Sequence, residues 1–400
     1  MLANDTVSAE RIHIAFFGMR NAGKSSVVNA VTSQDLSVVS PEKGTTTDPV
    51  RKTMELLPLG PVVIIDTPGI DDEGALGEMR VKRALKVLNQ CDAAVLVVDG
   101  TIGLQDDDRM LIDLFKKKGI GYVVAFNKAD LLSSIPSATD NEIYVSATKK
   151  TNIDALKNLL GKRFANEEND RKIIADLVSP GDVVVLVVPI DSSAPKGRLI
   201  LPQQQVIREV LECGAMAMVT REKELTQTLS SLQKKPRIVI TDSQAFGIVS
   251  KLTPNDIPLT SFSILFARYK GDLEKEVEGA AMLKKLKDGD TILISEGCTH
   301  HRQCQDIGTV KLPGWINAFT GKKLRYAFTS GGEFPEDLSP YALVVHCGAC
   351  MLSEREMKAR IRHSVDEGVP VTNYGVAIAM MHDILPRALE PFPAILKKLS

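Results

Sequence analysis

The sequence has no excess of charge of either sign. Its 49 lysine and arginine residues stand against 50 aspartate and glutamate residues, which leaves a formal net charge of −1 at pH 7. A protein that binds nucleic acid through the phosphates needs a basic surface. The balance therefore argues against a nucleic-acid partner.

Long apolar segments are also missing. No stretch approaches the roughly 18 uninterrupted apolar residues that a membrane-spanning helix needs. Residues 1–11 are polar and lack the positive start and apolar core of a secretory signal. We therefore expect a cytoplasmic protein with no membrane partner.

Cysteine is too scarce for a disulfide framework, because the chain has 6 cysteines in 400 residues. Three of them, Cys298, Cys347 and Cys350, share one spaced motif, which indicates metal binding in a reducing compartment. Internal repeats and low-complexity tracts are absent as well. A chain of this length is expected to form two or three domains, each with its own core.

The most informative segment is residues 18–25, GMRNAGKS, which fits G-x-x-x-x-G-K-[ST] at every fixed position. The apolar run 12–17 predicts a buried strand before it, and residues 26–31 predict the opening of a helix after it. In this setting Lys24 neutralises the β/γ oxygens of a nucleoside triphosphate, and the Ser25 hydroxyl ligates Mg²⁺. The other loop residues expected at the nucleotide are Asn21, Ala22, Gly23 and Ser26.

A second apolar strand, 62–65, leads into the sequence DTPG. There Asp66 can hold the Mg²⁺ through water, and Gly69 can offer its N–H to the γ-phosphate. Between the two motifs lies GTTTDP, which resembles the first switch of the Era/TrmE group of GTPases. One of its threonines would complete the Mg²⁺ shell, and we assign this role to Thr47, with Thr46 as the alternative.

The base is predicted to be guanine. Asn127, Lys128 and Asp130 follow a third apolar strand and form the N-K-x-D motif. The carboxylate of Asp130 would accept from two N–H groups on the edge of guanine, which adenine cannot supply, so adenine would leave a buried acceptor unpaired. Ser146 and Ala147 resemble the start of the S-A-[KL] loop that touches guanine from the other side.

Two positions resemble potassium-stimulated GTPases of this group. Asn21 occupies the loop position that ligates a monovalent cation there, and Ile70 stands where Ras-like enzymes carry glutamine. Bound K⁺ would then replace an arginine finger. Glu78 lies at the offset from Asp66 at which TrmE-like enzymes place a catalytic glutamate, although an exposed helix residue is its alternative role. We expect slow, K⁺-stimulated GTP hydrolysis that involves Lys24, Thr47, Gly69 and Glu78.

A second α/β unit is predicted after the polar linker 166–170, because apolar runs typical of strands alternate there with helical patterns. The runs expected to form strands are 183–190, 215–220, 237–241, 261–266, 291–295 and 342–345. The helices expected are 153–164 before the linker, and 204–212, 272–287 and 353–363 after it. Such alternation implies a parallel sheet in this second unit. A third unit is expected to begin near residue 272, with the helix 272–287 before the strand that leads to Cys298.

A cysteine and histidine cluster lies near the other end of the chain. Cys298 and His300 follow one predicted strand, and His346, Cys347 and Cys350 follow another. The two groups would lie close together if these strands are neighbours. Three cysteines with a histidine fit a zinc site, and three cysteines without a fourth nearby fit a [4Fe–4S] cluster with one exchangeable ligand equally well.

An Era/TrmE-like GTPase segment joined to C-x-H…H-C-x-x-C resembles HydF, the family of [FeFe]-hydrogenase maturation GTPases, over nearly the whole chain. The resemblance implies an α/β protein with three domains. These are a Ras-like P-loop GTPase domain at 1–168, a small α/β dimerisation domain at 178–268 and an α/β iron–sulfur domain at 270–400.

The resemblance further implies a GTP-hydrolysing scaffold that delivers the two-iron precursor of the hydrogenase active site. Cys298, Cys347 and Cys350 would hold a [4Fe–4S] cluster, with His300 and His346 as possible ligands. The implied partners are radical-SAM maturases, apo-[FeFe]-hydrogenase and a second copy of the chain, or more copies. The alternatives are a TrmE/Era-like GTPase for RNA modification or ribosome assembly with structural zinc, and a binding module with a vestigial GTPase site.

Overall fold

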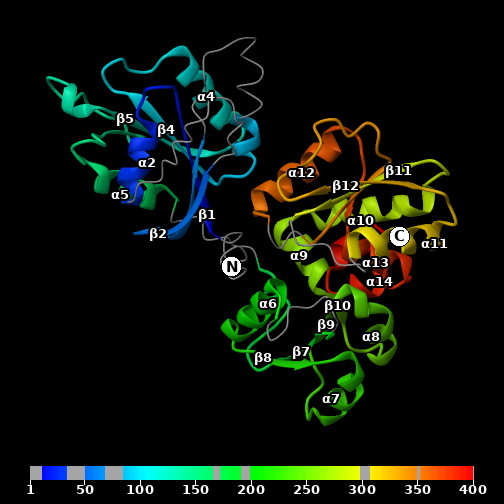
Figure 1. Cartoon of the computed structure of the whole chain (residues 1–400). Helices are drawn as coiled ribbons and strands as arrows, with labels where there is room; N and C mark the ends of the chain where they lie inside the picture. The colour runs from blue at the N-terminus through cyan, green and yellow to red at the C-terminus, as the bar shows by residue number, and fades with distance from the viewer. Residues whose placement is uncertain are drawn as a thin grey trace. The chain divides into compact units, whose positions relative to one another are not determined.

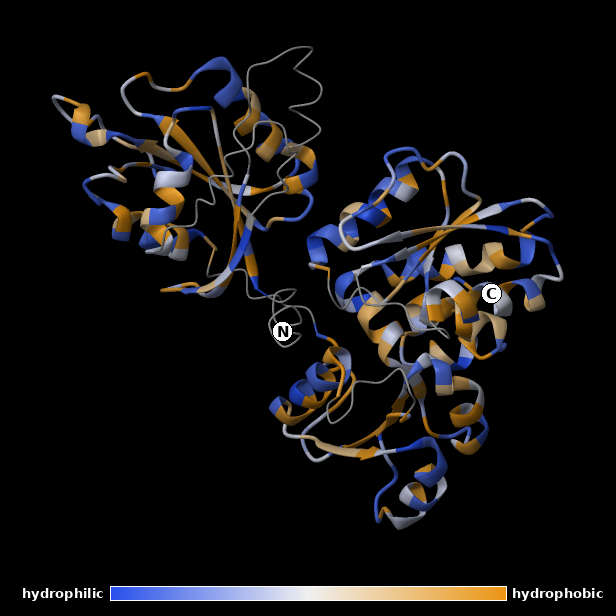
Figure 2. Ribbon diagram, viewed as in Figure 1, coloured by the Kyte–Doolittle hydropathy of each residue, from blue (hydrophilic) through white to orange (hydrophobic). Residues whose placement is uncertain are grey.

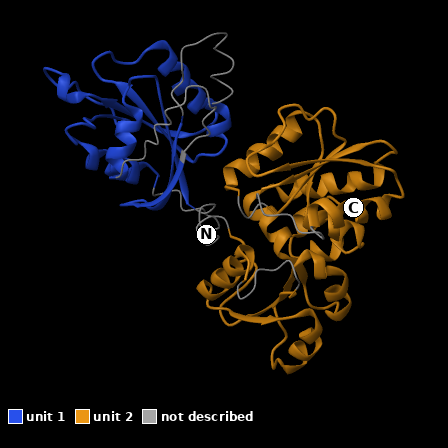
Figure 3. Ribbon diagram, viewed as in Figure 1, with its two compact units in different colours: residues 1–169 blue, residues 170–400 orange. Residues whose placement is uncertain are grey.

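The computed structural model describes residues 11–33, 50–67, 84–164, 172–190, 199–297, 307–348 and 352–399. The chain divides into two compact units, residues 1–169 and residues 170–400 (Figure 3). Each unit is described by itself.

The first unit is built on a six-stranded sheet in the order β2-β3-β1-β4-β5-β6 (Figure 1). All neighbours are parallel except β2 and β3, which are antiparallel. The strands are β1 (Ile12–Gly18), β2 (Val50–Leu56), β3 (Gly60–Asp66), β4 (Ala93–Asp99), β5 (Gly121–Asn127) and β6 (Glu142–Tyr144). The inner strands are apolar along their length, as Figure 2 shows, because helices cover both faces of a parallel sheet.

Alternate residues of β1 enter the cores on the two faces of this sheet. Ile14 and Phe16 pack with α2 (Lys24–Thr32) and α5 (Ile153–Phe164) on one face. Ala15 and Phe17 lie in the opposite core, which includes residues of α4 (Asp106–Lys117). The predicted strand 12–17 and helix 153–164 are confirmed.

The second unit contains two four-stranded parallel sheets, in the orders β10-β9-β7-β8 and β12-β11-β13-β14. The strands are β7 (Val183–Val187), β8 (Met216–Thr220), β9 (Ile238–Thr241), β10 (Leu259–Ser261), β11 (Thr291–Glu296), β12 (Arg325–Ser330), β13 (Leu343–His346) and β14 (Val371–Asn373). The parallel sheet expected after the linker is confirmed by the pairing of β7, β8, β9 and β10, and the second sheet is parallel as well.

One hydrophobic core joins the two sheets of the second unit, because it includes Val185 and Ile240 from the first sheet and Ile292 and Val345 from the second. Its central helix is α9, which packs against α6, α10, α12 and α13. The helices of this unit are α6 (Leu201–Glu212), α7 (Leu225–Ser231), α8 (Phe246–Leu252), α9 (Phe262–Lys270), α10 (Leu273–Ala281), α11 (Leu312–Thr320), α12 (Glu354–Asp366), α13 (Tyr374–Met381), α14 (Leu385–Ala388) and α15 (Pro393–Leu396).

The prediction of a strand over residues 261–266 is wrong, because most of this segment is the start of α9. The Ser261 side chain accepts a hydrogen bond from the N–H of Ile264 at 3.2 Å and so caps the helix. The apolar residues of α9 are buried around the helix, so the short apolar run carries no period that separates helix from strand. The other predicted strands and helices of this unit lie within a few residues of observed elements.

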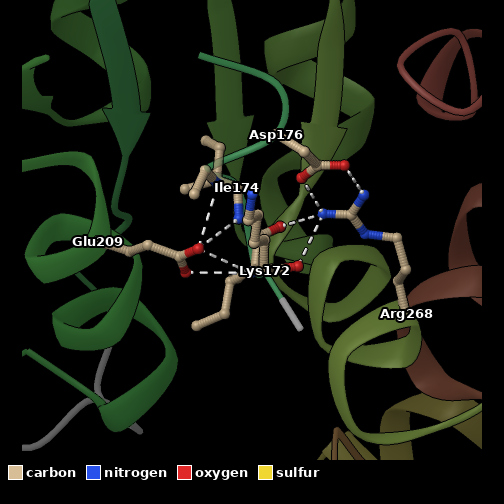
Figure 4. Close-up of polar contacts among 7 residues, drawn as sticks. Lys172, Ile174, Asp176, Glu209 and Arg268 are labelled. Carbon is tan, nitrogen blue, oxygen red and sulfur yellow. Dashed lines mark hydrogen bonds and ion pairs between the residues drawn. The ribbon is translucent and has the colours of Figure 1, made fainter. Parts of the chain in front are cut away.

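The first described segment of the second unit is fixed by a carboxylate from α6 (Figure 4). Glu209 accepts hydrogen bonds from the backbone N–H groups of Ile173 at 3.0 Å, Ala175 at 3.1 Å and Ile174 at 3.4 Å. A single side chain therefore satisfies three consecutive donors that belong to no strand.

A guanidinium from α9 binds the other side of the same segment (Figure 4). Arg268 donates to the carbonyl oxygens of Lys172 at 2.9 Å and Ile173 at 2.7 Å, and it pairs with both oxygens of Asp176 at 2.7 and 2.9 Å. The guanidinium also lies 4.9 Å from the centre of the Phe392 ring. Residues 172–176 are thus attached to two helices of the second unit.

We predict that Glu209→Ala accelerates amide hydrogen exchange at residues 173–175 by about tenfold or more. Removal of a partner from a partly buried N–H group costs about 1–3 kcal/mol. Exchange is measured by mass spectrometry on the full chain. Glu212→Ala is the control, because Glu212 lies on the same helix and only pairs with Arg208 at the surface. Equal exchange in both variants would show that Glu209 does not hold the segment.

Candidate functional site

The loop between β1 and α2 has two glycines that no other residue could replace without displacing a neighbour. Gly23 has a φ of 80°, and a Cβ added to it would lie 2.3 Å from Nδ2 of Asn127. A Cβ on Gly18 would lie 2.5 Å from the carbonyl oxygen of Val97. The end of β1 and the loop backbone are therefore packed directly against β4 and the end of β5.

Three groups predicted to bind phosphate and Mg²⁺ lie together at the end of β3. The ammonium of Lys24, which is buried, contacts Oδ1 of Asp66. The Ser25 hydroxyl lies 3.2 Å from Oδ2 of the same carboxylate. Because β1 and β3 are parallel neighbours, with Phe16 opposite Asp66, the two motifs meet at one edge of the sheet.

Asn127 links the phosphate loop to the loop after β6. Its Nδ2 donates to the carbonyl oxygen of Ala22 at 3.0 Å, and its Oδ1 accepts from the N–H of Ala147 at 3.1 Å. Asp130 lies in the short helix that follows β5, and its carboxylate is exposed. The Ser146 hydroxyl is buried and accepts from the N–H of Lys149 at 3.1 Å. The phosphate loop and both predicted guanine-binding segments are thus connected by one side chain.

Asp99, which sequence reasoning missed, belongs to the same site. It ends β4, and its Oδ2 lies 2.5 Å from the ammonium of Lys128, whose backbone is left-handed with a φ of 64°. Burial raises the pKa of Asp99, but hydrogen bonds from Lys128 and Thr101 outweigh it, so the pKa falls below its usual value. The sequence offered one signal for this residue, because Asp99 is an acidic residue at the end of an apolar run that predicts a buried strand. That strand pairs with β5, which leads into the N-K-x-D motif.

Arg20 and Asn21 of the loop are exposed, as are Ser25 and Ser26 in the first turn of α2, and Asn21 has a left-handed backbone with a φ of 66°. Thr47, Gly69 and Glu78 lie outside the described residues, as do Cys298, His300 and Cys350.

The strands that precede the two cysteine groups are neighbours, as the sequence analysis required for the groups to meet. β11 and β13 are parallel, with Ser295 opposite His346. Beyond this pair, the N–H of Cys347 donates to the carbonyl oxygen of Ser295 at 3.0 Å. The N–H of Gly297 donates to Sγ of Cys347 at 3.0 Å. Gly297 directly precedes Cys298 in the sequence, so the pairing places the two cysteine-bearing segments side by side.

His346 is fully buried at the end of β13, on the face that packs against α12. Its ring stacks on Phe334, with the ring centres 5.8 Å apart and the planes at 26°. Neither ring nitrogen has a hydrogen-bond partner within the part of the chain that the structure describes. Burial, and then the nearby charge of Arg360, lower the pKa of His346 well below its usual value, so the imidazole is neutral.

Arg360 of α12 forms hydrogen bonds at the ends of β11 and β12, on the sheet face that packs against α12. Its guanidinium is buried and donates to the carbonyl oxygen of Gly331 at 2.7 Å, to Glu356 at 2.6 Å and to the Ser295 hydroxyl at 3.3 Å. It also lies 5.2 Å from the centre of the Phe334 ring. The guanidinium of Arg360 therefore connects the end of β11, the segment after β12 and the helix α12.

Within the ranges that the structure describes, no three His, Cys, Asp or Glu side chains form a metal-binding group, and two of the three motif cysteines lie outside these ranges. No described helix is long and apolar enough to cross a membrane.

Three family models match the chain in succession. Residues 13–128 match the 50S ribosome-binding GTPase model, residues 173–271 match the hydrogen maturase F dimerization domain, and residues 274–391 match the hydrogen maturase F tetramerization domain. The last two together span more than half of the chain. The chain belongs to the hydrogen maturase F (HydF) family. The expected family and α/β fold class are confirmed.

Curated GTPases are similar to part of the chain. GTPase Der of Kosmotoga olearia is 34% identical over 166 residues, which are 37% of this chain and 37% of that protein. The tRNA modification GTPase MnmE of Francisella tularensis subsp. novicida is 31% identical over 172 residues, 41% of this chain and 38% of that protein. The match thus spans less than two fifths of the length of these curated relatives.

Solved structures of GTP-binding proteins are also similar. A variant of Aquifex aeolicus Era bound to GDP and aluminium fluoride is 20% identical, with a TM-score of 0.34, over 52% of this chain and 91% of that one. A probable GTP-binding protein, engB, is 24% identical, with a TM-score of 0.29, over 38% of this HydF chain and 97% of that one.

We predict that Gly23→Ala lowers the affinity for a fluorescent guanine nucleotide about tenfold or more, because the new methyl group would displace Asn127. The control is Gly119→Ala. Gly119 also has a positive φ, 61°, but a Cβ there meets nothing within 4 Å. In both variants the left-handed backbone adds a strain of about 1 kcal/mol. The two sites differ in the collision with Asn127 and in position, because only Gly23 lies in the phosphate loop. Equal affinity of the two variants would contradict the contact with Asn127.

Proposed function

We propose that this HydF-family protein hydrolyses GTP and carries a [4Fe–4S] cluster as a scaffold for [FeFe]-hydrogenase maturation, delivering the two-iron precursor of the active site. The observation that carries the proposal is the parallel pairing of β11 with β13. The pairing brings Cys347 into contact with Gly297, the residue before Cys298. The chain belongs to the HydF family.

The nucleotide site supports GTP as the substrate. Lys24 neutralises the β/γ oxygens, and Ser25 ligates Mg²⁺, which Asp66 holds through water. The exposed carboxylate of Asp130 selects guanine. The remaining roles are assigned to Thr47 in the Mg²⁺ shell, Gly69 at the γ-phosphate, Glu78 at the attacking water and Asn21 at K⁺.

The strand ends suit a cluster because Sγ of Cys347 already accepts a backbone N–H, an interaction that stabilises thiolate ligands. Cys298, Cys347 and Cys350 would be the ligands, with His300 and His346 as further candidates. The neutral imidazole of His346 has two nitrogens without partners among the described residues. A cluster held by three thiolates supplies one iron with an exchangeable position, through which it can bridge to a second metal fragment.

An exposed apolar edge strand, β8, supports assembly into a homodimer or a higher oligomer. β8 is an edge strand inside the segment that matches the dimerization model. Three of its apolar side chains are exposed, Met216 by 53%, Met218 by 40% and Val219 by 45%. An apolar edge strand offers both hydrogen-bonding groups and buried area to a second copy. The partners in maturation would be radical-SAM maturases and apo-[FeFe]-hydrogenase, in the cytoplasm.

We predict about four iron and four acid-labile sulfide atoms per chain after anaerobic purification. Cys347→Ser should lose them, and Cys213→Ser, which changes the cysteine directly after α6, should keep them. GTP hydrolysis should persist in both variants, because the phosphate site belongs to the other compact unit. Stoichiometric zinc without iron would contradict the proposal and favour an RNA-modification GTPase.

We predict that GTP hydrolysis is faster in K⁺ than in Na⁺ and that Asn21→Ala removes the difference. The reason is that an amide oxygen at this exposed loop position can ligate the larger ion. Asn152→Ala is the control, because Asn152 also has a left-handed backbone, with a φ of 58°, but lies outside the phosphate loop. Rates are measured as phosphate release in either salt. A wild type with equal rates would remove K⁺ from the mechanism.

A further inference from the structure

Lys128 has a backbone conformation that lysine rarely adopts. Its φ is 64° and its ψ is 29°, in the left-handed region that favours glycine. Backbone hydrogen bonds fix this geometry from both sides. The carbonyl oxygen of Asn127 accepts from the N–H of Gly100 at 2.7 Å, and the N–H of Ala129 donates to the carbonyl oxygen of Val145 at 3.0 Å. Strain that the surroundings enforce in this way is concentrated at functional sites.

The side chain of Lys128 is held at its far end by Asp99, the last residue of β4. Asp99 lies opposite Asn127, the residue before Lys128, in the pairing of β4 with β5. Its Oδ2 lies 2.5 Å from Nζ of Lys128. The carboxylate is 15% exposed and the lysine side chain 33% exposed, so the ion pair is partly shielded from water. The lysine is therefore fixed both at its backbone and at its ammonium group.

The carboxylate of Asp99 is fixed in turn. Its Oδ1 accepts hydrogen bonds from the backbone N–H of Thr101 at 3.0 Å and from the Thr101 hydroxyl at 2.6 Å. Burial raises the pKa of Asp99, but the hydrogen bonds from Lys128 and Thr101 lower the pKa further, so the group is ionised at pH 7. Gly100 has no room for a side chain, because a Cβ there would lie 2.7 Å from the carbonyl oxygen of Asn127. The turn after β4 therefore presents a fixed anion to Lys128.

We infer that Asp99 is a positioning residue for the guanine base and acts through Lys128. The four-carbon stem of Lys128 is held at both ends, two residues before Asp130. A methylene chain is apolar and can cover one face of a planar base, while the carboxylate of Asp130 binds its edge. A stem that is already ordered spares the nucleotide the loss of affinity that ordering a flexible side chain would bring. This inference rests on the proposed use of GTP.

A purely structural ion pair would serve only to hold the ends of β4 and β5 together. The backbone already does this, because Gly100 donates to the carbonyl oxygen of Asn127 beyond the last paired residues of the two strands. A structural pair and a positioning pair also differ in what their loss changes. Loss of the first lowers the melting temperature, whereas loss of the second weakens the binding of nucleotide.

The test uses four variants of the full chain. Asp99→Asn keeps the shape of the side chain and an acceptor for Thr101, but it removes the negative charge that binds Lys128. Lys128→Met keeps an apolar stem and removes the ammonium group, and a third variant combines the two changes. Asp113→Asn is the matched control, because Asp113 lies on α4, is 79% exposed and pairs with Lys116 at 3.9 Å.

The first measurement is the rate at which an amine-reactive ester labels Lys128 in the nucleotide-free chain, followed by peptide mass spectrometry. A paired ammonium must leave its partner and lose its proton before it reacts, so we expect labelling about tenfold faster in Asp99→Asn than in the wild type. The control should label Lys128 at the wild-type rate. An unchanged rate in Asp99→Asn would show that Asp99 does not hold Lys128.

The second measurement is the steady-state kinetics of GTP hydrolysis. In Asp99→Asn the KM for GTP should rise about tenfold while kcat stays within about twofold, because the change weakens binding of the base and leaves Lys24 and Ser25 in place. Lys128→Met should show the same split. The double variant should be no worse than either single variant, because Asp99 acts only through Lys128.

The two measurements separate the possible failures. A rise in KM of about hundredfold in the double variant, the product of the single effects, would overturn the action through Lys128. A lower melting temperature with a wild-type KM in Asp99→Asn would show a purely structural ion pair. A wild type that binds no guanine nucleotide would contradict the proposed function instead, and the labelling of Lys128 would still decide whether Asp99 holds it.

Discussion

Parallel strand pairing is the constraint on which both sites depend. In a parallel sheet the carboxyl ends of neighbouring strands emerge at one edge, so residues distant in sequence meet there. In the first unit this edge joins Lys24, Asp66 and Asn127, each just after or at the end of a different strand. In the second unit it joins Gly297 and Cys347, whose N–H···S contact needs only that β11 and β13 pair directly. Parallel pairing thus brings together the residues of the nucleotide site and those of the cysteine motif in the same way.

The nucleotide site was largely predictable, because its residue types follow from local spacing. A glycine-rich loop after a buried strand, and an asparagine and an aspartate after another, identify the groups without reference to the rest of the fold. The spacing of the motifs in the sequence does not show which side chains hold the loops in place. Asn127 was expected to serve the base, yet its amide joins Ala22 to Ala147. Asp99 was missed although it ends a buried apolar strand, because none of the recognised motifs includes it.

The proximity of the two cysteine groups was predictable only on the condition that the strands before them are neighbours. The sequence indicated that both cysteine groups follow strands, but the order β12-β11-β13-β14 depends on packing between segments far apart in the chain. The same reason explains the error over residues 261–266. It also explains why the burial of Lys270, the last residue of α9, could not be predicted. A short apolar run has no readable period when every side of it is buried. From sequence alone, a lysine at the end of a helix is expected to be exposed, because the segments that cover it are not known.

The shared core of the second unit limits how the dimerization and tetramerization segments can be exchanged between proteins during evolution. The dimerization and tetramerization segments are separate in sequence, but Val185 and Ile292 lie in one apolar cluster, and α9 packs against helices of both. Either segment alone would leave part of that cluster in water, at a cost of about 25 cal/mol per Å². The GTPase unit has cores of its own. During evolution it could therefore be exchanged as a single piece, whereas the other two segments can be gained or lost only as a pair.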